Sequence, residues 1–218
     1  MSATTRAFAL PALAAGFALA TLAPVVEAQD EPSGPPEGWV VLTDRGGHGG
    51  GDLQFVDMPP GWHITTGPSG IFYHPDNTAS GEFVVESEVF LFDPGSRNEA
   101  FGIFIGGDGL DGDEQVYTYF LIRRDGSALV KRRDGGSTSN IMGWTPAESV
   151  VTWEERGDEA VTARNVLRVE VGGGEMAFSV NGEEVYRGST DGVRVDGVVG
   201  LRVNHGLNLH FSSLEISS

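Results

Sequence analysis

Alternation of apolar and polar residues with a period of two is the feature of this sequence that most restricts its fold. In the segment NVLRVEV, Leu167, Val169 and Val171 alternate with Arg168 and Glu170. This is the pattern of a β-strand with one buried and one solvated face. The following segment, EMAFSV, has the same pattern. Half-buried antiparallel strands are therefore predicted here.

Short turn sequences separate the predicted strands at regular intervals. Asp125-Gly126 lies between FLIRR and ALVKRR, and Asn181-Gly182 lies between MAFSV and EEVYRG. Both dipeptides tolerate the positive φ of two-residue hairpins, so each is predicted to join neighbouring strands.

Two segments depart from simple alternation. LNLHFSSLEI changes parity near Ser212, which predicts a β-bulge there. Residues 145–148, TPAE, have the pattern of a helix start, but the β-branched residues after them limit it to one turn. About a dozen short strands with glycine-rich turns and almost no helix predict an all-β jelly-roll β-sandwich of two antiparallel sheets.

The N-terminal segment has the pattern of an export signal. Arg6 is followed by a mostly apolar run, and VEA at residues 26–28 fits the small-residue rule for signal peptidase. We therefore predict a signal peptide over residues 1–28 with cleavage after Ala28, a flexible polar leader over 29–38 and a single domain over 39–218. The expected location is periplasmic or secreted.

The charge and the missing cysteines restrict the partners. A formal net charge of −17 repels nucleic acid and anionic lipid, so we expect neither a nucleic-acid partner nor a membrane partner after signal cleavage. Neutral ligands such as carbohydrates, or cations, are the expected partners. Because the chain has no cysteine, it can have no disulfide, no thiolate metal site and no lipid-modified N-terminal cysteine.

The C-terminal third resembles a known group of jelly rolls. The order NVLRVEVGGGEMAFSVNGEEVYRG and then DGVVGLRVNHGLNLHFSSLEI is similar to the end of concanavalin A-like domains of the lectin, glucanase and laminin-G superfamily. GPSGIFYH, GEFVVESEVFLF and NEAFGIFIGG follow the order of exported domains named after 3-keto-disaccharide hydrolases. The resemblance covers residues 39–218. It implies a jelly-roll fold and, for the second group, hydrolysis of 3-keto-glycosides.

Two motifs of these relatives are missing. No glutamate is followed two residues later by aspartate, although jelly-roll glucanases of the superfamily carry a Glu-x-Asp-x-Glu strand. The keto-hydrolase group usually has a Tyr-Glu-Val-Gln motif in its middle third, and the nearest stretch here, VYTYFLI, has no glutamate. The resemblance therefore predicts the fold more strongly than the chemistry.

A pair of glutamates is the candidate catalytic feature. Glu86 and Glu88 are two residues apart on a predicted strand, so they point to one face with backbones roughly 6.5–7 Å apart. Glycoside hydrolysis uses two carboxyl groups at such separations, one as acid and the other as base or nucleophile. The alternative is that both glutamates solubilise the wet face of a sheet.

The acidic segment GGDGLDGDEQ is the candidate metal site. Asp108, Asp111, Asp113 and Glu114 lie within seven residues, and carboxylates are ligands that Ca²⁺ accepts in irregular geometry. A solvated acidic connection between two strands is the alternative. We expect no cofactor, with Ca²⁺ as the exception to be tested.

A basic hairpin is the candidate ligand-binding surface. If Asp125-Gly126 forms a two-residue turn, Tyr119 lies opposite Arg132, and Phe120 lies opposite Lys131. An aromatic ring beside arginine on a concave face can stack on a sugar and hydrogen-bond its hydroxyls. Tyr119, Arg123 and Arg132 are therefore candidate contacts, and neutralisation of nearby carboxylates is the alternative.

The histidines contribute one further candidate. Asn204 and His205 stand at a predicted strand end, where side chains can reach a cleft, so both are candidate ligand contacts. The five histidines, at positions 48, 63, 74, 205 and 210, show no HxH or HxxxH spacing. Their spacing along the chain therefore supports no zinc site.

Three functions are compatible with these observations. The first is an exported module that binds a carbohydrate or sugar derivative on a concave face. The second is a 3-keto-glycoside hydrolase in which Glu86 or Glu88 transfers the proton, and the third is a structural or adhesive domain without a small ligand. An exposed aromatic residue beside arginine on the concave sheet would favour the first, and converging carboxylates in a deep pocket would favour the second.

Overall fold

The computed structural model describes residues 34–44 and 53–218, together with Met1. These residues form fifteen β-strands and no helix, so the described part of the chain contains no helix that could span a membrane. The strands belong to one compact unit, Pro32–Ser218. Residues 2–28 of the predicted signal peptide and residues 29–33 of the predicted leader lie outside the described residues.

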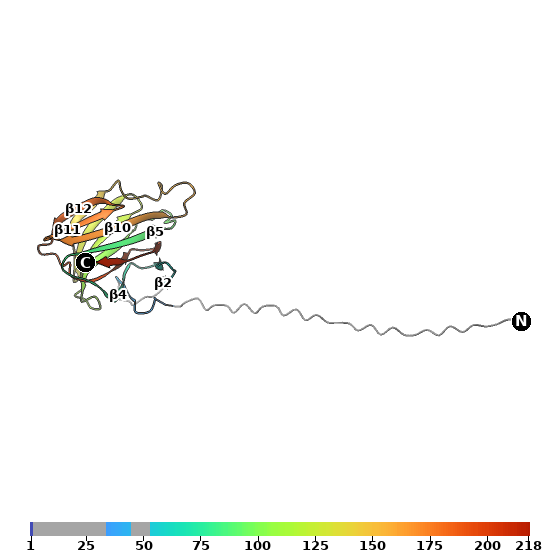
Figure 1. Cartoon of the computed structure of the whole chain (residues 1–218), viewed down its shortest axis with the longest axis horizontal. Coiled ribbons are helices and arrows are strands. Elements are labelled where there is room, and N and C mark those ends of the chain that lie inside the picture. The colour runs from blue at the N-terminus through green and yellow to red at the C-terminus, as the bar shows by residue number, and fades with distance from the viewer. Residues whose placement is uncertain (2–33, 45–52) are drawn as a thin grey trace. The chain divides into compact units, whose positions relative to one another are not determined.

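The strands form two antiparallel sheets (Figure 1). The first, which we call sheet A, has the order β1 (Val40–Thr43), β4 (Gly70–Ala79), β13 (Gly197–Val203), β6 (Ala100–Asp108), β7 (Val116–Arg123), β8 (Ser127–Asp134) and β9 (Ser137–Pro146). The second, sheet B, has the order β12 (Glu183–Ser189), β11 (Glu175–Val180), β10 (Ala163–Gly172), β5 (Phe83–Leu91), β14 (Asn208–Phe211), β3 (Trp62–Thr65) and β2 (Gln54–Asp57). β15 (Glu215–Ser217) pairs with β5 beyond the end of β14. The predicted all-β jelly-roll sandwich is confirmed.

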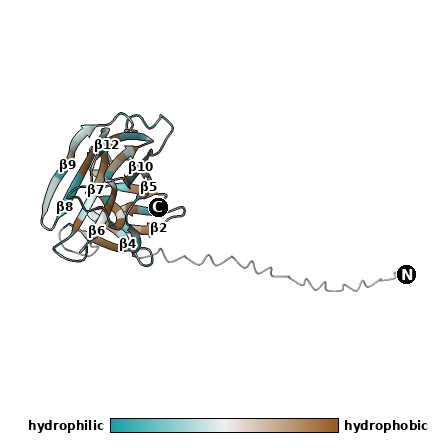
Figure 2. Ribbon diagram, turned by 60° about the vertical axis from the view of Figure 1, so that its left-hand side comes forward, coloured by the Kyte–Doolittle hydropathy of each residue, from teal (hydrophilic) through white to brown (hydrophobic). Residues whose placement is uncertain are grey.

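The main core lies between the two sheets. On β10, Leu167, Val169 and Val171 are buried, as their alternation predicts, and they belong to one cluster with Phe120 of β7 and Phe178 of β11. Figure 2 shows the central strands β6 and β7 as predominantly hydrophobic and the edge strand β9 as less so. Burial of this apolar surface is the main stabilising contribution to the fold.

Sheet A is strongly curved, and its outer face is concave. Nη1 of Arg133 on β8 lies 3.9 Å from Oδ1 of Asp44, the residue after β1, although four strands separate β1 from β8. At a strand spacing of about 4.8 Å, a flat sheet would hold β1 and β8 about 24 Å apart, beyond the reach of the two side chains. Only curvature of the sheet brings these residues together.

The curve encloses a second apolar cluster. Leu42, Ile71, Phe104, Tyr117 and Leu129 are among its buried members, and none of them belongs to the core between the sheets. Most of β6 and β7 is therefore buried on both faces.

Gly102 lies on β6 at a close approach between strands of sheet A. Gly102 pairs with Arg202 on one side and with Leu121 on the other. A Cβ at Gly102 would clash with the carbonyl oxygen of Phe120. The missing side chain therefore allows β6 and β7 to approach closely at this position.

The turn between β7 and β8 contains three residues, not the expected two. Tyr119 therefore pairs with Lys131 instead of Arg132, and Phe120 pairs with Val130 instead of Lys131. Because side chains alternate along a strand, this shift by one residue places Arg132 and Tyr119 on different faces of sheet A. The predicted register of this hairpin was wrong.

The second predicted hairpin is confirmed. Asn181 and Gly182 have φ values of 51° and 86°, and Val180 pairs directly with Glu183. Two residues with positive φ match the type I′ turn that the Asn-Gly sequence favours.

The parity change near Ser212 is also confirmed. Phe211 pairs with Val89 and Glu215 pairs with Glu86, so four steps along the C-terminal segment match three steps along β5. One extra residue in one strand is the defining feature of a β-bulge.

The expected turn of helix at residues 145–148 does not form. Thr145 and Pro146 end β9, and the Thr145 hydroxyl donates to the carbonyl of Gly143 (3.0 Å) instead of capping a helix. The N–H of Val150 then donates to the carbonyl of Ala147 (3.0 Å) in a turn. The β-strand extends through the first two residues of the predicted capping motif.

The crowding at Gly102 can be tested by substitution. We expect Gly102→Ala to lower the free energy of unfolding by about 1–3 kcal/mol, because the added methyl group overlaps backbone of the neighbouring strand. Gly136→Ala is the matched control, since a Cβ there meets nothing within 4 Å. Chemical denaturation of both variants measures the difference, and equal stability would contradict the close approach at Gly102.

Candidate ligand-binding site

A cleft of about 560 Å³ opens on the concave face of sheet A. Leu42, Ile71 and Leu110 supply its apolar lining. The volume lies within the range of small-molecule sites, which combine an apolar lining with a few oriented polar groups.

The polar groups of the cleft come from separate parts of the chain. Asp44 follows β1, Arg133 lies near the end of β8, and Tyr117 lies near the start of β7. Asp111 and Asp113 of the acidic loop complete the lining together with a glutamine amide. The cleft thus presents a guanidinium, carboxylates, an amide and a phenol, which together can donate and accept hydrogen bonds.

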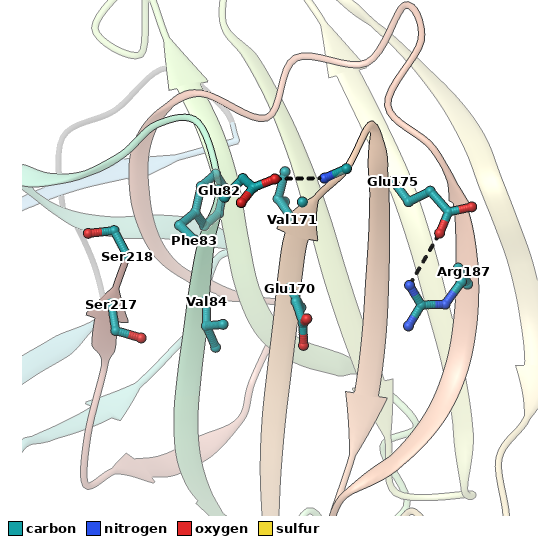
Figure 3. A pocket seen from close by; sticks show the side chains of 11 residues that line it. Glu82, Phe83, Val84, Glu170, Val171, Glu175, Arg187, Ser217 and Ser218 are labelled. Carbon is teal, nitrogen blue, oxygen red and sulfur yellow. Dashed lines mark hydrogen bonds and ion pairs between the residues drawn. The ribbon is translucent and has the colours of Figure 1, made fainter.

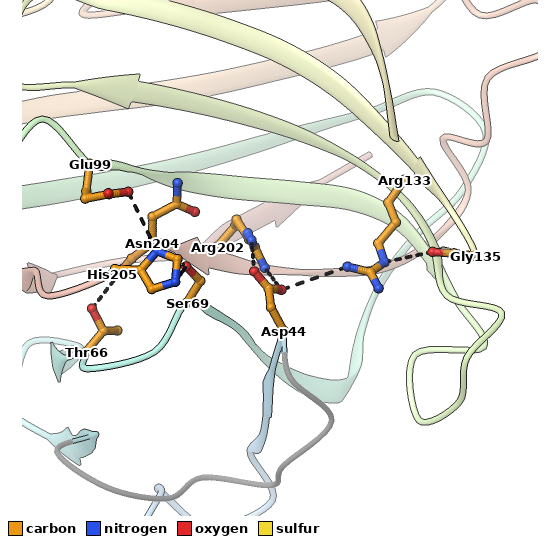
Figure 4. A network of polar contacts seen from close by, with 9 residues as sticks. All are labelled: Asp44, Thr66, Ser69, Glu99, Arg133, Gly135, Arg202, Asn204 and His205. Carbon is orange, nitrogen blue, oxygen red and sulfur yellow. Dashed lines mark hydrogen bonds and ion pairs between the residues drawn. The ribbon is translucent and has the colours of Figure 1, made fainter. Parts of the chain in front are cut away.

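Asp44 is held by Arg202, which lies near the end of β13 on the concave face. The two terminal guanidinium nitrogens of Arg202 each donate a hydrogen bond to one carboxylate oxygen of Asp44, both at 2.6 Å (Figure 4). Arg202 is only 9% exposed, and its guanidinium carbon lies 5.9 Å from the ring centroid of Tyr119. A bidentate pair of this kind fixes the carboxylate in one orientation.

Electrostatics keep this pair ionised. Burial alone would raise the pKa of Asp44, but the hydrogen bonds and charge of Arg202, with the charge of Arg133, hold it below its usual value. Burial also raises the pKa of Tyr119 to about 12. Its phenol is therefore neutral at physiological pH.

A second polar group lies at one end of the same face (Figure 4). Ser69 Oγ is 2.8 Å from Nδ1 of His205, and Glu99 Oε2 is 3.9 Å from the same nitrogen. The carbonyl of Asn204 accepts a hydrogen bond from the Thr66 hydroxyl at 2.6 Å.

The contact between serine and histidine does not have the geometry of a nucleophilic triad. In such a triad the acid and the nucleophile face different nitrogens of the ring, whereas Ser69 and Glu99 both lie nearest Nδ1 of His205. Ser69 is also only 1% exposed. We therefore assign this serine a role in positioning His205.

Two of the predicted ligand contacts share the concave face. Tyr119 and Arg123 lie on the same side of β7, as their even spacing requires. The Arg123 guanidinium stacks on Trp144 of β9, 3.9 Å from the ring centroid, and Trp144 is 40% exposed. Arg132, by contrast, donates to the carbonyl of Gly192 (2.7 Å) on the other side of the sheet. Its predicted position opposite Tyr119 was therefore wrong, and a ligand contact at Arg132 stays a prediction.

Glu86 and Glu88 lie on the outer face of sheet B. Glu86 is 3.7 Å from Arg168, and Glu88 pairs with Arg164 and accepts a hydrogen bond from Ser212. The hydrogen bond from Ser212, with the pairing to Arg164, lowers the pKa of Glu88. The two predicted catalytic residues are therefore ion-paired and stand apart from the concave cleft.

The acidic loop is divided between two surroundings. Asp108 pairs with Arg194 at 3.2 Å, while Asp111 and Asp113 line the cleft and Glu114 is exposed. Within the described residues, no group of three or more His, Cys, Asp or Glu side chains is arranged to hold a metal ion. Calcium binding by Asp108, Asp111, Asp113 and Glu114 stays a prediction.

A smaller concavity of about 310 Å³ lies on sheet B near the C-terminus (Figure 3). Glu82 accepts a hydrogen bond from the N–H of Gly173 (3.1 Å), and Glu175 pairs with Arg187 (3.4 Å). Its charged side chains are already satisfied by their neighbours, so the cleft on sheet A is the better candidate site.

Asp44 and Arg202 were not identified from the sequence. The available signal was an arginine at an outward position of the apolar strand GVVGLRV, two residues after a glycine. A charged residue in such a strand needs a partner, but no sequence pattern connects it to Asp44.

The ion pair leads to a prediction for pH. We expect Asp44→Asn to lower the free energy of unfolding by about 3 kcal/mol at pH 7, because it leaves the buried Arg202 without its counter-charge. Since folding lowers the pKa of Asp44, its contribution is complete above the unfolded-state pKa of about 4 and is lost as the pH falls through the folded-state value.

Urea denaturation of both proteins between pH 7 and pH 3 measures this effect. The difference between the unmodified protein and the variant should shrink at the acid end. A difference that is independent of pH, or absent at pH 7, would contradict the role given to Asp44.

Comparisons with known proteins agree on the fold. No family model matches the chain, and no curated protein matches it by sequence. Among solved structures, the carbohydrate-binding module CBM66 from Bacillus subtilis is similar with a TM-score of 0.60 and 15% identity, over 83% of this chain and 96% of that one. A β-glucanase from Bacillus licheniformis has a TM-score of 0.57 and 11% identity, over 85% and 95%.

A third structure, a Bacillus subtilis protein of unknown function with a galectin-like fold, has a TM-score of 0.54 and 11% identity, over 82% of this chain and 88% of that one. At these identities the similarity concerns the fold alone. None of the three is described as a 3-keto-disaccharide hydrolase, so that part of the resemblance stays a prediction. The chain has the concanavalin-like jelly-roll fold.

Proposed function

We propose that the protein binds a carbohydrate or sugar derivative in the cleft on the concave face of sheet A. The observation that carries this proposal is the cleft itself, about 560 Å³ in volume, with an apolar lining and a fixed set of polar groups. Sugars have an apolar ring face and many hydroxyl groups, so they match a site with both properties.

The polar groups suit hydroxyl ligands. A hydroxyl group both donates and accepts hydrogen bonds, and Asp44 and Arg133 offer an acceptor and a donor 3.9 Å apart. Because Asp44 is held by Arg202, it is oriented before the ligand arrives. Such preorganisation lowers the entropy that binding must overcome.

The outer face of sheet A also carries an exposed aromatic residue beside arginine. Trp144 stacks with Arg123 at one end of this face and stays 40% exposed. This is the feature expected of a sugar-binding module. The carbohydrate-binding module and the β-glucanase of the same fold support the proposal as structural analogy.

Hydrolysis by Glu86 or Glu88 has weaker support. A general acid must hold its proton near neutral pH, whereas the pKa of Glu88 is lowered by Ser212 and Arg164. The two carboxylates pair with arginines on an outer sheet face. We therefore place binding without catalysis first.

Export is part of the proposal. The N-terminal pattern of a signal peptide fits a protein that acts in the periplasm or outside the cell, where glycans are available. A net charge of −17 directs the choice of ligand towards neutral sugars.

The first prediction for binding concerns Arg133. We expect Arg133→Ala to weaken binding of the best ligand from a glycan array by about tenfold or more, because a charged hydrogen-bond donor is lost from the cleft. Arg168→Ala is the matched control, since Arg168 also pairs with carboxylates but lies on sheet B. Isothermal titration calorimetry measures both, and equal affinities would contradict a ligand in this cleft.

A second prediction separates binding from hydrolysis. The double variant Glu86→Gln, Glu88→Gln should bind the same glycan with unchanged affinity, because both residues lie on the other sheet. Mass spectrometry of 3-keto-glucosides and plain glucosides incubated with the protein should show no product. Turnover by the unmodified protein that is lost in this variant would contradict binding without catalysis and support the hydrolase.

A further inference from the structure

A group of four polar residues lies at one end of sheet A, beside the cleft. It consists of Ser69 just before β4, Glu99 just before β6, and Asn204 and His205 just after β13. β13 lies between β4 and β6, and the antiparallel pairing of these strands brings the four residues to the same end of the sheet. We call these four residues the rim group.

Asp44 connects the rim group to the cleft. Its N–H donates to the carbonyl of Ser69 (3.0 Å), and Ser69 Oγ lies 2.8 Å from Nδ1 of His205. On the other side, the Asp44 carboxylate faces Arg133 of the cleft at 3.9 Å. Figure 4 shows the same order, with Asp44 and Arg202 between His205 on one side and Arg133 on the other. The polar side chains therefore form one row from the cleft to the rim group.

The rim group is accessible and wide enough for a sugar ring. The side chains of His205 and Glu99 are 56% and 37% exposed. The group spans three neighbouring strands, which at a spacing of about 4.8 Å is about 10 Å across. An imidazole, a carboxylate and an amide can together donate and accept hydrogen bonds, as the hydroxyl groups of a sugar require.

Hydrogen bonds hold the rim group in place before a ligand arrives. The Thr66 hydroxyl donates to the carbonyl of Asn204 (2.6 Å) and accepts from the N–H of Leu207 (3.0 Å). The N–H of Asn204 donates to the carbonyl of Ala100 on β6 (2.9 Å). The segment after β13 is therefore fixed at both ends, and a fixed site loses little conformational entropy on binding.

We propose that the rim group is a second sugar subsite, so that the ligand is a neutral oligosaccharide of at least two units. This inference rests on the proposed function and adds the length of the ligand and the residues that contact its second unit. One unit occupies the cleft beside Arg133, and the next contacts His205 and Glu99. Asp44 lies between the two subsites and can accept hydrogen bonds from both units. Because the units are covalently linked, binding of the first raises the effective concentration of the second.

Isothermal titration calorimetry with neutral gluco-, galacto- and fructo-oligosaccharides of one to four units tests the proposal. In the series that binds best, the disaccharide should bind about tenfold or more tightly than the monosaccharide. The double variant Glu99→Ala, His205→Ala should lose most of this gain and keep its affinity for the monosaccharide. Arg133→Ala should weaken binding of both ligands. Glu86→Ala, on sheet B, is the matched control and should change neither affinity.

The outcomes separate the second subsite from the proposed function. Equal affinities of the unmodified protein for monosaccharide and disaccharide, or a gain that survives in the double variant, would overturn the second subsite and leave sugar binding in the cleft intact. Binding of no sugar in the panel would contradict the proposed function for these sugars, and with it the second subsite.

A measurement on the unmodified protein keeps the test valid if the double variant folds poorly. In saturation-transfer difference NMR with the best-bound disaccharide, protons of both sugar units should receive saturation from the protein. Saturation confined to one unit would overturn the second subsite.

Discussion

The ion pair between Arg202 and Asp44 joins β13 to the end of the edge strand β1 across the concave face of sheet A. Arg202 is only 9% exposed, and a buried guanidinium cannot remain charged in an apolar surrounding without a counter-charge and hydrogen bonds. Asp44 supplies both through two 2.6 Å hydrogen bonds. The pair therefore places a carboxylate in the cleft, and Arg133 can approach it only because the sheet is curved.

The curvature also explains why the sequence shows which face is buried for strands of sheet B but not for the central strands of sheet A. β5 and β10 alternate between buried and partly exposed residues, so a period of two is visible and their faces can be assigned from the sequence. In β6 and β7 nearly every residue is buried, because the curve encloses a second cluster on the outer face. An apolar run has no period, so the sequence predicted these strands without showing which side faced the core.

Contacts between distant parts of the chain were the main features that the sequence could not predict. Asp44 and Arg202 are the example, because 158 residues separate them along the chain and only the folded sheet brings them together. The face of Arg132 was predicted wrongly for a local reason, because one additional turn residue shifted the register and placed Arg132 on the other face of sheet A. The second hairpin and the bulge near Ser212 were predicted correctly, because both depend on residues that are close together in the sequence.

The charges around Asp44 support the proposal of a ligand that interacts through hydroxyl groups. At long range, a net charge of −17 repels anions. Around Asp44 the charges are paired, because Arg202 and Arg133 are both directed to it, while Asp111 and Asp113 also line the cleft. A neutral polyol can share the donors and acceptors of such a group without separating the charges. An ionic ligand at Asp44 would have to compete with an ion pair that is already formed, which is one reason why a neutral sugar is the proposed ligand.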